Sequence, residues 1–453
     1  MLLTFKYSRK NKQYLLQLPK IAQIPANIQT LYSPQSFCET LLKTILTAKY
    51  RIYIVALSLE QDQGGKVILD ALYQARQFNS YLEIAVLVDW HRAQRSRIGS
   101  HNNYANAADW YFHMVKAHPG IEVPVYGVPI NTREALGVLH LKGFIIDDQV
   151  IYSGASLNNV YLHQQGKYRY DRYHIIRNLP LADSLLSYIK QQFFTTPAVN
   201  RLDIPTRIKR YQIKHYTKLL RQSLRDTCYS YKGSATLNEL AITPLVGLGK
   251  QSILNQTIYQ LICTVNTKII LCTPYFNMPR LLMQNLVAQL RKGKMIEIIV
   301  GDKTANDFYI SHDKPFKMIN MLPYLYEMNL RNFLYRLQRY IDNGQLTVRL
   351  WKNGENSYHV KGIWVDNEWL LLTSNNLNSR SWLLDLENGL LIHDHYNQLY
   401  LQSKQELSFI RTYTKVILHF NQLQSIAEYP TTVRKIIYRL RPILIDRLIS
   451  KLL

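Results

Sequence analysis

A short motif with the pattern H-x-K-x-x-x-x-D occurs twice in this chain, and no other feature limits the possible folds as strongly. Each copy supplies a histidine, a lysine and an aspartate, which are His140, Lys142, Asp147, His359, Lys361 and Asp366. A single match to so short a pattern carries little weight, because such matches arise by chance. Two matches with identical spacing, both in strand-like segments, indicate an internal duplication of the chain.

The hydrophobic pattern supports this duplication. The segments 50–60 and 82–90 are rich in β-branched residues and enclose a segment with helical periodicity at 67–78. The segments 268–276 and 295–303 enclose another segment of the same kind. A buried strand, a helix and a second buried strand form the opening unit of an α/β domain. The sequence therefore predicts an α/β protein whose two halves begin in the same way.

Similar polar side chains follow the two motifs. Each half has a serine, an asparagine and a later carboxylate, and the set consists of Ser156, Asn158, Asp171, Ser374, Asn376 and Glu387. Serine and asparagine can donate hydrogen bonds to phosphate oxygens. A carboxylate beside a histidine fixes the tautomer of the ring and stabilises its cationic form.

These residue types suit the transfer of a phosphoryl group. Residues i and i+2 of a strand point to the same face, so each motif histidine lies beside its lysine. A neutral imidazole can attack phosphorus, while a second, protonated imidazole donates a proton to the leaving oxygen. The lysines can neutralise the charge on the non-bridging oxygens. As members of the same motifs, Asp147 and Asp366 are also predicted to be catalytic. No acidic cluster suited to magnesium accompanies the motifs, so we predict catalysis without a metal ion or other cofactor.

The charge of the chain narrows the choice of partners. The 453 residues carry a formal net charge of +24, which favours a nucleic acid, an acidic membrane surface or a phosphate-bearing substrate. The four cysteines show no C-x-x-C spacing, which is typical of reduced structural cysteines in a cytosolic protein. We see no signal peptide and no apolar run long enough to span a bilayer, so any contact with lipid is expected at the membrane surface.

Two basic segments are candidates for that contact. Residues 201–225 mix arginines and lysines with tyrosines and leucines, and residues 433–453 combine a basic face with an apolar stripe at helical spacing. Such a helix suits an anionic membrane interface, but the same stripe would equally pack on the protein core. Residues 318–340 could likewise line an entrance for lipid or form a buried core helix.

The duplicated motif resembles that of the phospholipase D superfamily. This resemblance implies two pseudo-twofold-related halves, each a mixed β-sheet flanked by helices, and one active site between them. It also implies a phosphohistidine intermediate formed without metal. By analogy His140 is the nucleophile and His359 the general acid and then base, with the lysines and the serine and asparagine side chains on the phosphate and Asp171 and Glu387 orienting the histidines.

Within the superfamily, four segments resemble the bacterial phosphatidylserine synthase family: 89–95, 127–134, 140–163 and 167–173. The resemblance implies transfer of a phosphatidyl group from CDP-diacylglycerol to L-serine with release of CMP. It also implies a cytoplasmic protein held peripherally at the inner face of the membrane. Arg92, Arg95 and Arg133 are candidates for binding the pyrophosphate or the serine carboxylate, because guanidinium groups suit both.

We expect four parts along the chain. Residues 1–200 form the first half, 201–250 a basic connection, 251–425 the second half and 426–453 a basic C-terminal helix. Alternative functions remain open at this point: another phosphatidyltransferase, a phospholipase or a nuclease of the same superfamily, or a non-catalytic protein that binds membranes, ribosomes or another polyanion. The sequence leaves the oligomeric state open.

Overall fold

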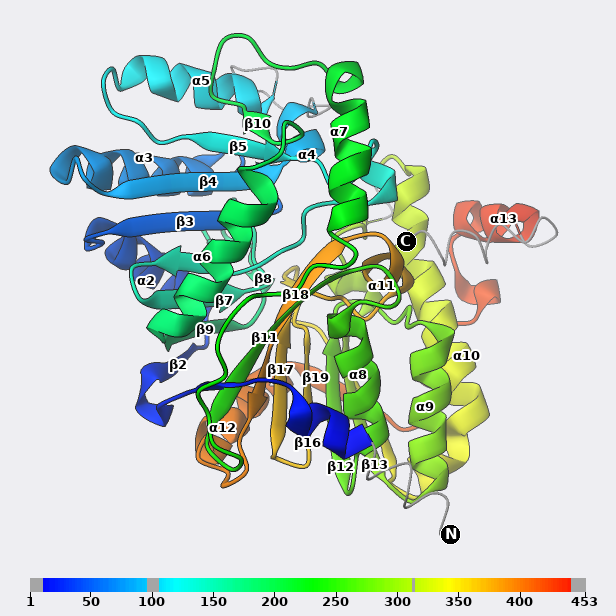
Figure 1. Ribbon diagram of the computed structural model, residues 1–453. Coiled ribbons are helices and arrows are strands. Elements are labelled where there is room, and N and C mark those ends of the chain that lie inside the picture. Colours follow the sequence, from blue (N-terminus) through cyan, green and yellow to red (C-terminus); the bar gives the residue numbers. More distant parts are fainter. Residues whose placement is uncertain (1–10, 96–105, 312–313, 441–453) are drawn as a thin grey trace.

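The computed structural model describes residues 11–95, 106–311 and 314–440 (Figure 1). Its described helices are α2 (Pro34–Leu46), α3 (Gln63–Phe78), α4 (Trp90–Gln94), α5 (Ala107–Ala117), α6 (Leu179–Phe193), α7 (Arg210–Ser223), α8 (Ile253–Thr264), α9 (Arg280–Arg291), α10 (Leu322–Asp342), α11 (Ser379–Leu383), α12 (Tyr400–Arg411) and α13 (Thr431–Leu440). Several begin at side chains that accept hydrogen bonds from the first turn, such as Ser33, Asp62 and Ser252.

The first half is built on an eight-stranded mixed sheet. Its strands lie in the order β10 (Asn200–Arg201), β5 (Val125–Val128), β4 (Glu83–Asp89), β3 (Arg51–Ala56), β6 (Phe144–Ile146), β7 (Gln149–Ser153), β9 (Tyr173–Arg177) and β2 (Ile28–Leu31). Strands β3, β4 and β5 are parallel, and the strands from β6 to β2 continue antiparallel.

The second half repeats this arrangement in a nine-stranded sheet. Its order is β1 (Ile21–Ala22), β11 (Ala241–Leu248), β18 (Leu386–His393), β17 (Trp369–Thr373), β16 (Gly362–Val365), β12 (Lys268–Thr273), β13 (Met295–Gly301), β14 (Leu346–Trp351) and β19 (Thr414–Ile417). Strands β12, β13 and β14 are parallel, and β16, β17 and β18 continue antiparallel from β12. The repeated strand order confirms the predicted α/β fold of two related halves.

The division of the chain between the sheets differs from the predicted segments in two places. Strand β1 lies near the N-terminus, yet it pairs with β11 in the second sheet. Strand β11 itself falls within residues 201–250, which we expected to connect the halves. The second sheet thus includes one strand from each of these segments: β11 pairs with β18, and β1 pairs with β11 at the edge.

The two halves share a hydrophobic core. One cluster of buried side chains draws on both sheets, with Tyr53 and Leu141 from the first half and Val360 and Leu390 from the second. Two further clusters bury α2 and α3 on the outer face of the first sheet, and α8, α9 and α10 on that of the second. Sequence segments far apart therefore meet at the interface between the sheets, where the motifs lie.

A third, two-stranded sheet links the halves directly. It pairs β8 (Arg169–Tyr170) of the first half with β15 (Ser357–Tyr358) of the second. Both motif histidines lie in extended segments just before β6 and β16, rather than inside regular strands. Within the described residues, no helix is long and apolar enough to cross a bilayer.

Candidate active site

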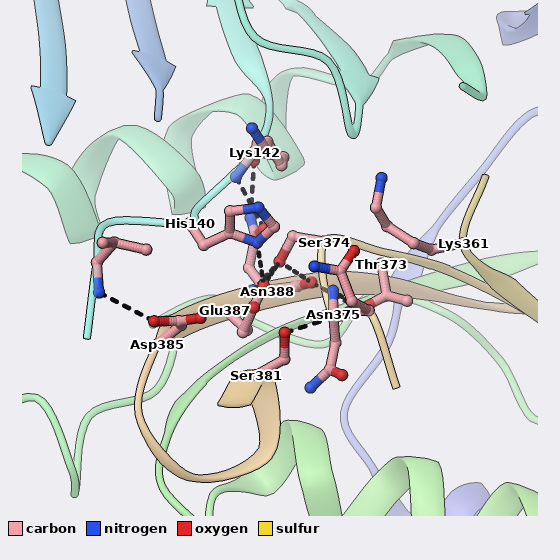
Figure 2. Close-up of polar contacts among 12 residues, drawn as sticks. His140, Lys142, Lys361, Thr373, Ser374, Asn375, Ser381, Asp385, Glu387 and Asn388 are labelled. Atoms are coloured by element: carbon pink, nitrogen blue, oxygen red, sulfur yellow. Dashed lines mark hydrogen bonds and ion pairs between the residues drawn. The ribbon is translucent and has the colours of Figure 1, made fainter. Parts of the chain in front are cut away.

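The histidine of the first motif is held by residues of the second half (Figure 2). The backbone N–H of His140 donates to the carbonyl of Leu386 at 3.0 Å, and its Nδ1 lies 2.7 Å from Oε2 of Glu387. The hydroxyl of Ser374 also donates to this carboxylate oxygen. With Nδ1 occupied, the opposite nitrogen, Nε2, is the one that can react.

The histidine of the second motif is held in the same way by the first half. The backbone N–H of His359 donates to the carbonyl of Tyr170 at 2.8 Å, and its Nδ1 lies 2.8 Å from Oδ2 of Asp171. Strand β8 ends at Tyr170, directly before Asp171, and β15 ends at Tyr358, directly before His359, so the pairing of these strands positions the carboxylate and the ring. The two sites are related by the duplication, and each carboxylate orients the histidine of the opposite half.

The two motif lysines are both almost completely buried. Lys142 Nζ donates to the carbonyl of Ala155 at 3.2 Å, whereas Lys361 Nζ lies 2.8 Å from Oδ2 of Asp171. Burial, together with the positive charge of Lys361, lowers the pKa of Lys142 to about 7. Burial also lowers the pKa of Lys361, although Asp171 opposes this shift. Two buried amino groups of this kind form a site that an anion would stabilise.

The carboxylates at the site are ionised despite their burial. Burial alone would raise the pKa of Asp171, but Lys361 and His359 outweigh it and hold this pKa well below its usual range. The charge and hydrogen bond of His140 lower the pKa of Glu387 against the effect of burial in the same way. Burial and the charge of Lys361 lower the pKa of His359 well below its ordinary value, so this ring is neutral before substrate binds.

The residue after each carboxylate holds the lysine segment of the opposite half. Asn388 accepts a hydrogen bond from the backbone N–H of Lys142 at 2.9 Å and donates to its carbonyl at 2.7 Å. Arg172, at the equivalent position, donates to the carbonyl of Lys361 and to both oxygens of Glu406. Sequence reasoning missed this pair, although both residues directly follow a predicted site carboxylate.

Known proteins are similar to this chain over its whole length. The chain is 57% identical to the CDP-diacylglycerol–serine O-phosphatidyltransferase of Escherichia coli strain K12, with 100% of both chains covered. It is 45% identical to the enzyme of that name from Haemophilus influenzae, with 98% of this chain and 99% of the relative covered. The chain belongs to the CDP-diacylglycerol–serine O-phosphatidyltransferase family. Residues 258–409 match the family model described as "Cardiolipin synthase, PLD-like domain".

A solved structure of this phosphatidyltransferase family has the same fold. The crystal structure of phosphatidylserine synthase from Haemophilus influenzae superposes with a TM-score of 0.94 at 44% identity, and covers 98% of this chain and 100% of that chain. The predicted resemblance to the phospholipase D superfamily, and to this family within it, is thereby confirmed.

The motif aspartates lie away from the histidines. The carboxylate of Asp147 accepts hydrogen bonds from the backbone N–H groups of Lys49, Tyr50 and Arg51, where β3 begins. Asp366 binds three consecutive backbone N–H groups before and at the start of β12. Asp147 directly follows β6 and Asp366 directly follows β16, at the end of each strand that is farther from the motif histidine. We therefore propose a structural role for both, in place of the catalytic role predicted from the motif.

The structure aligns the segments after the two motifs with a shift of one residue. Ser153 accepts a hydrogen bond from the backbone of Ala155 at 3.1 Å, and Thr373 accepts the equivalent bond from Asn375 at 3.1 Å. The shift arises because the turn between β16 and β17 is one residue longer than the turn between β6 and β7. Matching the halves by motif spacing alone therefore fails beyond this turn.

The shift changes the roles of the predicted asparagines. The side chain of Asn158 accepts from the backbone of Tyr161 at 3.2 Å, and Asn378 makes the equivalent contact, accepting from Ser381 at 2.8 Å. Asn158 thus caps a turn. Asn376 differs, because its buried Oδ1 has no hydrogen-bond partner among the described residues.

The two predicted serines, Ser156 and Ser374, have different residues as their counterparts in the other half. Ser156 is buried and is the counterpart of Asn376, whereas Ser374 is the counterpart of Gly154. A side chain at Gly154 would overlap Lys361 Nζ and Asp171, so this position requires glycine. In the second half the same place holds the Ser374 hydroxyl, which binds Glu387.

The predicted arginines lie in a cluster near the His140 segment. Arg92 and Arg95 both bind Oε1 of Glu134, at 2.6 and 3.0 Å, and Arg133 immediately precedes this glutamate. Arg380, which the sequence did not single out, donates to the carbonyl of Glu134 at 2.9 Å. The cluster is partly exposed and positively charged overall, as a phosphate-binding surface requires.

Two buried carboxyl groups that the sequence analysis missed support the His140 segment. Asp89 accepts from the backbone N–H of Leu139 at 3.0 Å, and Asp385 accepts from that of Val138 at 3.0 Å. Burial raises the pKa of Asp385 to about 6, although Arg380 opposes this shift. These contacts fix the chain just before the histidine, and only the tertiary structure brings them together.

The described residues contain one group with the geometry of a metal site, and it lies elsewhere. Glu368, His393 and His395 converge near the turn between β16 and β17, close to Asp366. Around the two motif histidines, the lysines occupy the positions where a phosphate would need positive charge.

Proposed function

We propose that the protein transfers the phosphatidyl group of CDP-diacylglycerol to L-serine and releases CMP, through a phosphohistidine intermediate. The observation that carries this proposal is the pair of histidine–carboxylate contacts, at 2.7 and 2.8 Å, exchanged between the halves around two buried lysines. The names of the relatives support the donor and the acceptor, and the site residues support the chemistry.

The first half-reaction forms the intermediate. Nε2 of His140 attacks the phosphorus that carries diacylglycerol, and the bond from this phosphorus to the CMP oxygen breaks. His359 donates a proton to that leaving oxygen. Lys142 and Lys361 bind the non-bridging oxygens as negative charge builds up in the transition state. A bound phosphate also raises the pKa of a neighbouring imidazole, so substrate binding prepares His359 as the acid.

The second half-reaction releases the product. The hydroxyl of serine attacks the same phosphorus, His359 takes the hydroxyl proton, and the bond from phosphorus to His140 breaks. Glu387 stabilises the positive charge on His140 while the ring carries phosphorus, and Asp171 does the same for protonated His359. Because the products leave in sequence, the scheme predicts ping-pong kinetics.

The test follows CMP release from CDP-diacylglycerol in detergent micelles containing EDTA, with and without L-serine. We expect serine-stimulated release with phosphatidylserine as product, and its loss in His140→Ala and His359→Ala. CMP release at the same rate with and without serine would mean that the acceptor is a different molecule. Release that requires added magnesium would contradict the phosphohistidine scheme, and binding without any turnover would favour a non-catalytic protein.

A groove between α9 and α10 is suited to the acyl chains of the lipid. It has a volume of about 1080 Å³, and its walls include Phe276, Met283, Val287 and Leu337. Its rim carries Arg280, Arg291, Arg336 and Arg339, and it extends to Trp382 on α11, next to Arg380 of the arginine cluster. An apolar floor with a cationic rim complements a lipid with an anionic headgroup.

We also propose that the protein binds the inner face of the membrane peripherally, through anionic lipid. Helix α7 buries only a narrow stripe at Ile213, Thr217 and Leu220. The exposed residues of this helix include Arg210, Lys214, Lys218, Tyr211 and Leu219. Helix α13 packs on the protein rather than presenting its apolar stripe to a membrane, because Val433 and Ile437 are buried against the α10 region. The C-terminal segment after residue 440 lies outside the described residues.

Co-sedimentation with vesicles tests this membrane proposal. We expect binding to vesicles that contain anionic lipid, weak binding to neutral vesicles, and release at high salt. Reversal of charge on α7, in Lys214→Glu with Lys218→Glu, should weaken binding. Equal binding to both kinds of vesicle, or displacement of the protein by ribosomes at low concentration, would favour another partner.

A further inference from the structure

An ion pair that the mechanism above does not use lies beside His359. Arg169, in β8, places Nη2 2.7 Å from Oδ1 of Asp307, and its Nε donates to Ser357 Oγ at 3.1 Å. The side chains of Arg169 and Asp307 remain 19% and 16% exposed, so the pair is partly open to solvent, although Oδ1 of Asp307 is buried. The pair is therefore neither a buried structural bridge nor a fully solvated one.

A single tyrosine connects this pair to the catalytic histidine. The guanidinium of Arg169 lies 4.7 Å from the ring centroid of Tyr161, and the His359 ring lies 5.5 Å from the same centroid. The Tyr161 hydroxyl is 3.2 Å from Nδ1 of His359. The ion pair is thus one aromatic ring away from the group that we propose takes the proton of the acceptor.

The chemistry of the pair fits a zwitterion better than a phosphate. Asp307 places a carboxylate beside the guanidinium, and its second oxygen accepts from the Tyr275 hydroxyl at 3.2 Å. A phosphate at Arg169 would meet repulsion from this carboxylate. An amino acid would gain two contacts instead: its carboxylate on the guanidinium, and its ammonium on Asp307 next to the tyrosine rings.

We propose that Arg169 and Asp307 bind the carboxylate and the ammonium group of the amino-acid acceptor, and thereby position its hydroxyl at His359. The inference rests on the proposed function, because it assigns a subsite to the acceptor of that reaction. It also divides the site: the arginine cluster around Glu134 carries a surplus of positive charge, whereas this pair is electrically balanced.

Measuring the two half-reactions separately distinguishes a residue that binds the acceptor from one that the whole reaction needs. Exchange of labelled CMP into CDP-diacylglycerol needs only the first half-reaction, whereas phosphatidylserine formation also needs the acceptor. In Arg169→Gln and Asp307→Asn, we expect CMP exchange within about twofold of the parent enzyme and a KM for serine raised on the order of tenfold or more. Arg411→Gln, which removes part of a bridge to Glu297 elsewhere, is the control.

Acceptor analogues give a second and independent readout. Ethanolamine lacks the carboxylate, and 3-hydroxypropionate lacks the ammonium group. We expect Arg169→Gln to reduce the preference for serine over ethanolamine, and Asp307→Asn to reduce the preference for serine over 3-hydroxypropionate. A residue that merely stabilised the fold would not change these two preferences in opposite patterns.

The failure of this inference is distinguishable from failure of the proposed function. If the parent enzyme shows no CMP exchange, the proposed function itself is wrong. If it exchanges CMP but the variants keep the parent KM for serine and the parent preferences, the subsite assignment is overturned. Loss of exchange in both Arg169→Gln and Arg169→Lys would also overturn it, because the residue would then act on the donor or on folding.

Discussion

Asp171 accepts a hydrogen bond from His359, which belongs to the opposite half of the molecule, with 2.8 Å between Oδ2 and Nδ1. Glu387 returns the contact to His140 at 2.7 Å. The two halves thus exchange their orienting carboxylates. The backbone contacts also cross between the halves, because Tyr170 binds His359 and Leu386 binds His140. The active site is therefore a product of the interface between the halves.

Removal of either charge should reduce turnover without unfolding the protein. In Asp171→Asn and Glu387→Gln, we expect kcat to fall by on the order of 10²–10⁴-fold, because the ring loses the partner that stabilises its cation. Steady-state assays with both substrates saturating would measure this. Glu368→Gln, whose carboxylate pairs with His393 and with neither motif histidine, is the matched control. An unchanged kcat in Asp171→Asn would contradict the assignment.

Gly154→Ala should damage the site through sterics alone. The added methyl group would overlap Lys361 Nζ and both oxygens of Asp171, so the ion pair must open or the strand must shift. We expect activity to fall at least about tenfold, with the melting temperature changed by only a few degrees. Gly166→Ala, where nothing lies within 4 Å, serves as control. Full activity in Gly154→Ala would show that the pair is not needed.

The motif aspartates should behave as structural residues. Asp147→Ala and Asp366→Ala each remove an acceptor of three backbone hydrogen bonds, so the free energy of unfolding should fall by about 1–3 kcal/mol. Denaturant unfolding measures this change. Activity per folded molecule should persist at low temperature. An inactive variant with unchanged stability would restore the catalytic role predicted from the motif.

The pKa of Lys142 predicts how the first half-reaction depends on pH. Because burial and Lys361 lower this pKa to about 7, Lys142 loses its proton and its positive charge as the pH rises above that value. We expect kcat/KM for CDP-diacylglycerol to fall above about pH 7, since this ratio reports on the free enzyme. CMP exchange measured across neutral and alkaline pH would test this. A rate that stays flat would place the lysine pKa elsewhere.

The groove between α9 and α10 can be tested through the length of the lipid. Val287→Glu puts a charge on its apolar wall, so we expect KM for long-chain CDP-diacylglycerol to rise at least about fivefold. A short-chain, water-soluble analogue should react normally. Val287→Leu keeps the apolar surface and is the control. Equal effects on both substrates would mean that the acyl chains lie elsewhere.

Much of this site could be predicted from the sequence, because the chemistry depends on rigid local spacing. The histidine and lysine of each motif are two residues apart in extended chain, so they stay together wherever the segment lies. The two later carboxylates could be found by comparing the repeats. What the repeats did not reveal is which carboxylate serves which histidine, since that depends on how the halves pack.

Other features depend on tertiary contacts that leave no local pattern. One extra residue in the turn after Asp366 shifted the alignment of the serines and asparagines, so Ser374 is the counterpart of a glycine. Arg169 lies in β8 of the first half and Asp307 follows β13 in the second half, so they meet only across the interface. Asp147 shares its motif with His140, yet it serves the start of β3. Spacing within a motif does not distinguish these roles.

The exchange of carboxylates has an evolutionary consequence. Neither half contains a complete histidine–carboxylate unit of its own, so a mutation at Asp171 is felt by the second half and one at Glu387 by the first. Natural selection therefore acts on pairs of positions that lie far apart in the gene. A chimaera that joins one half to the other half of a distant relative must inherit both members of each pair, and recombination within the gene is correspondingly constrained.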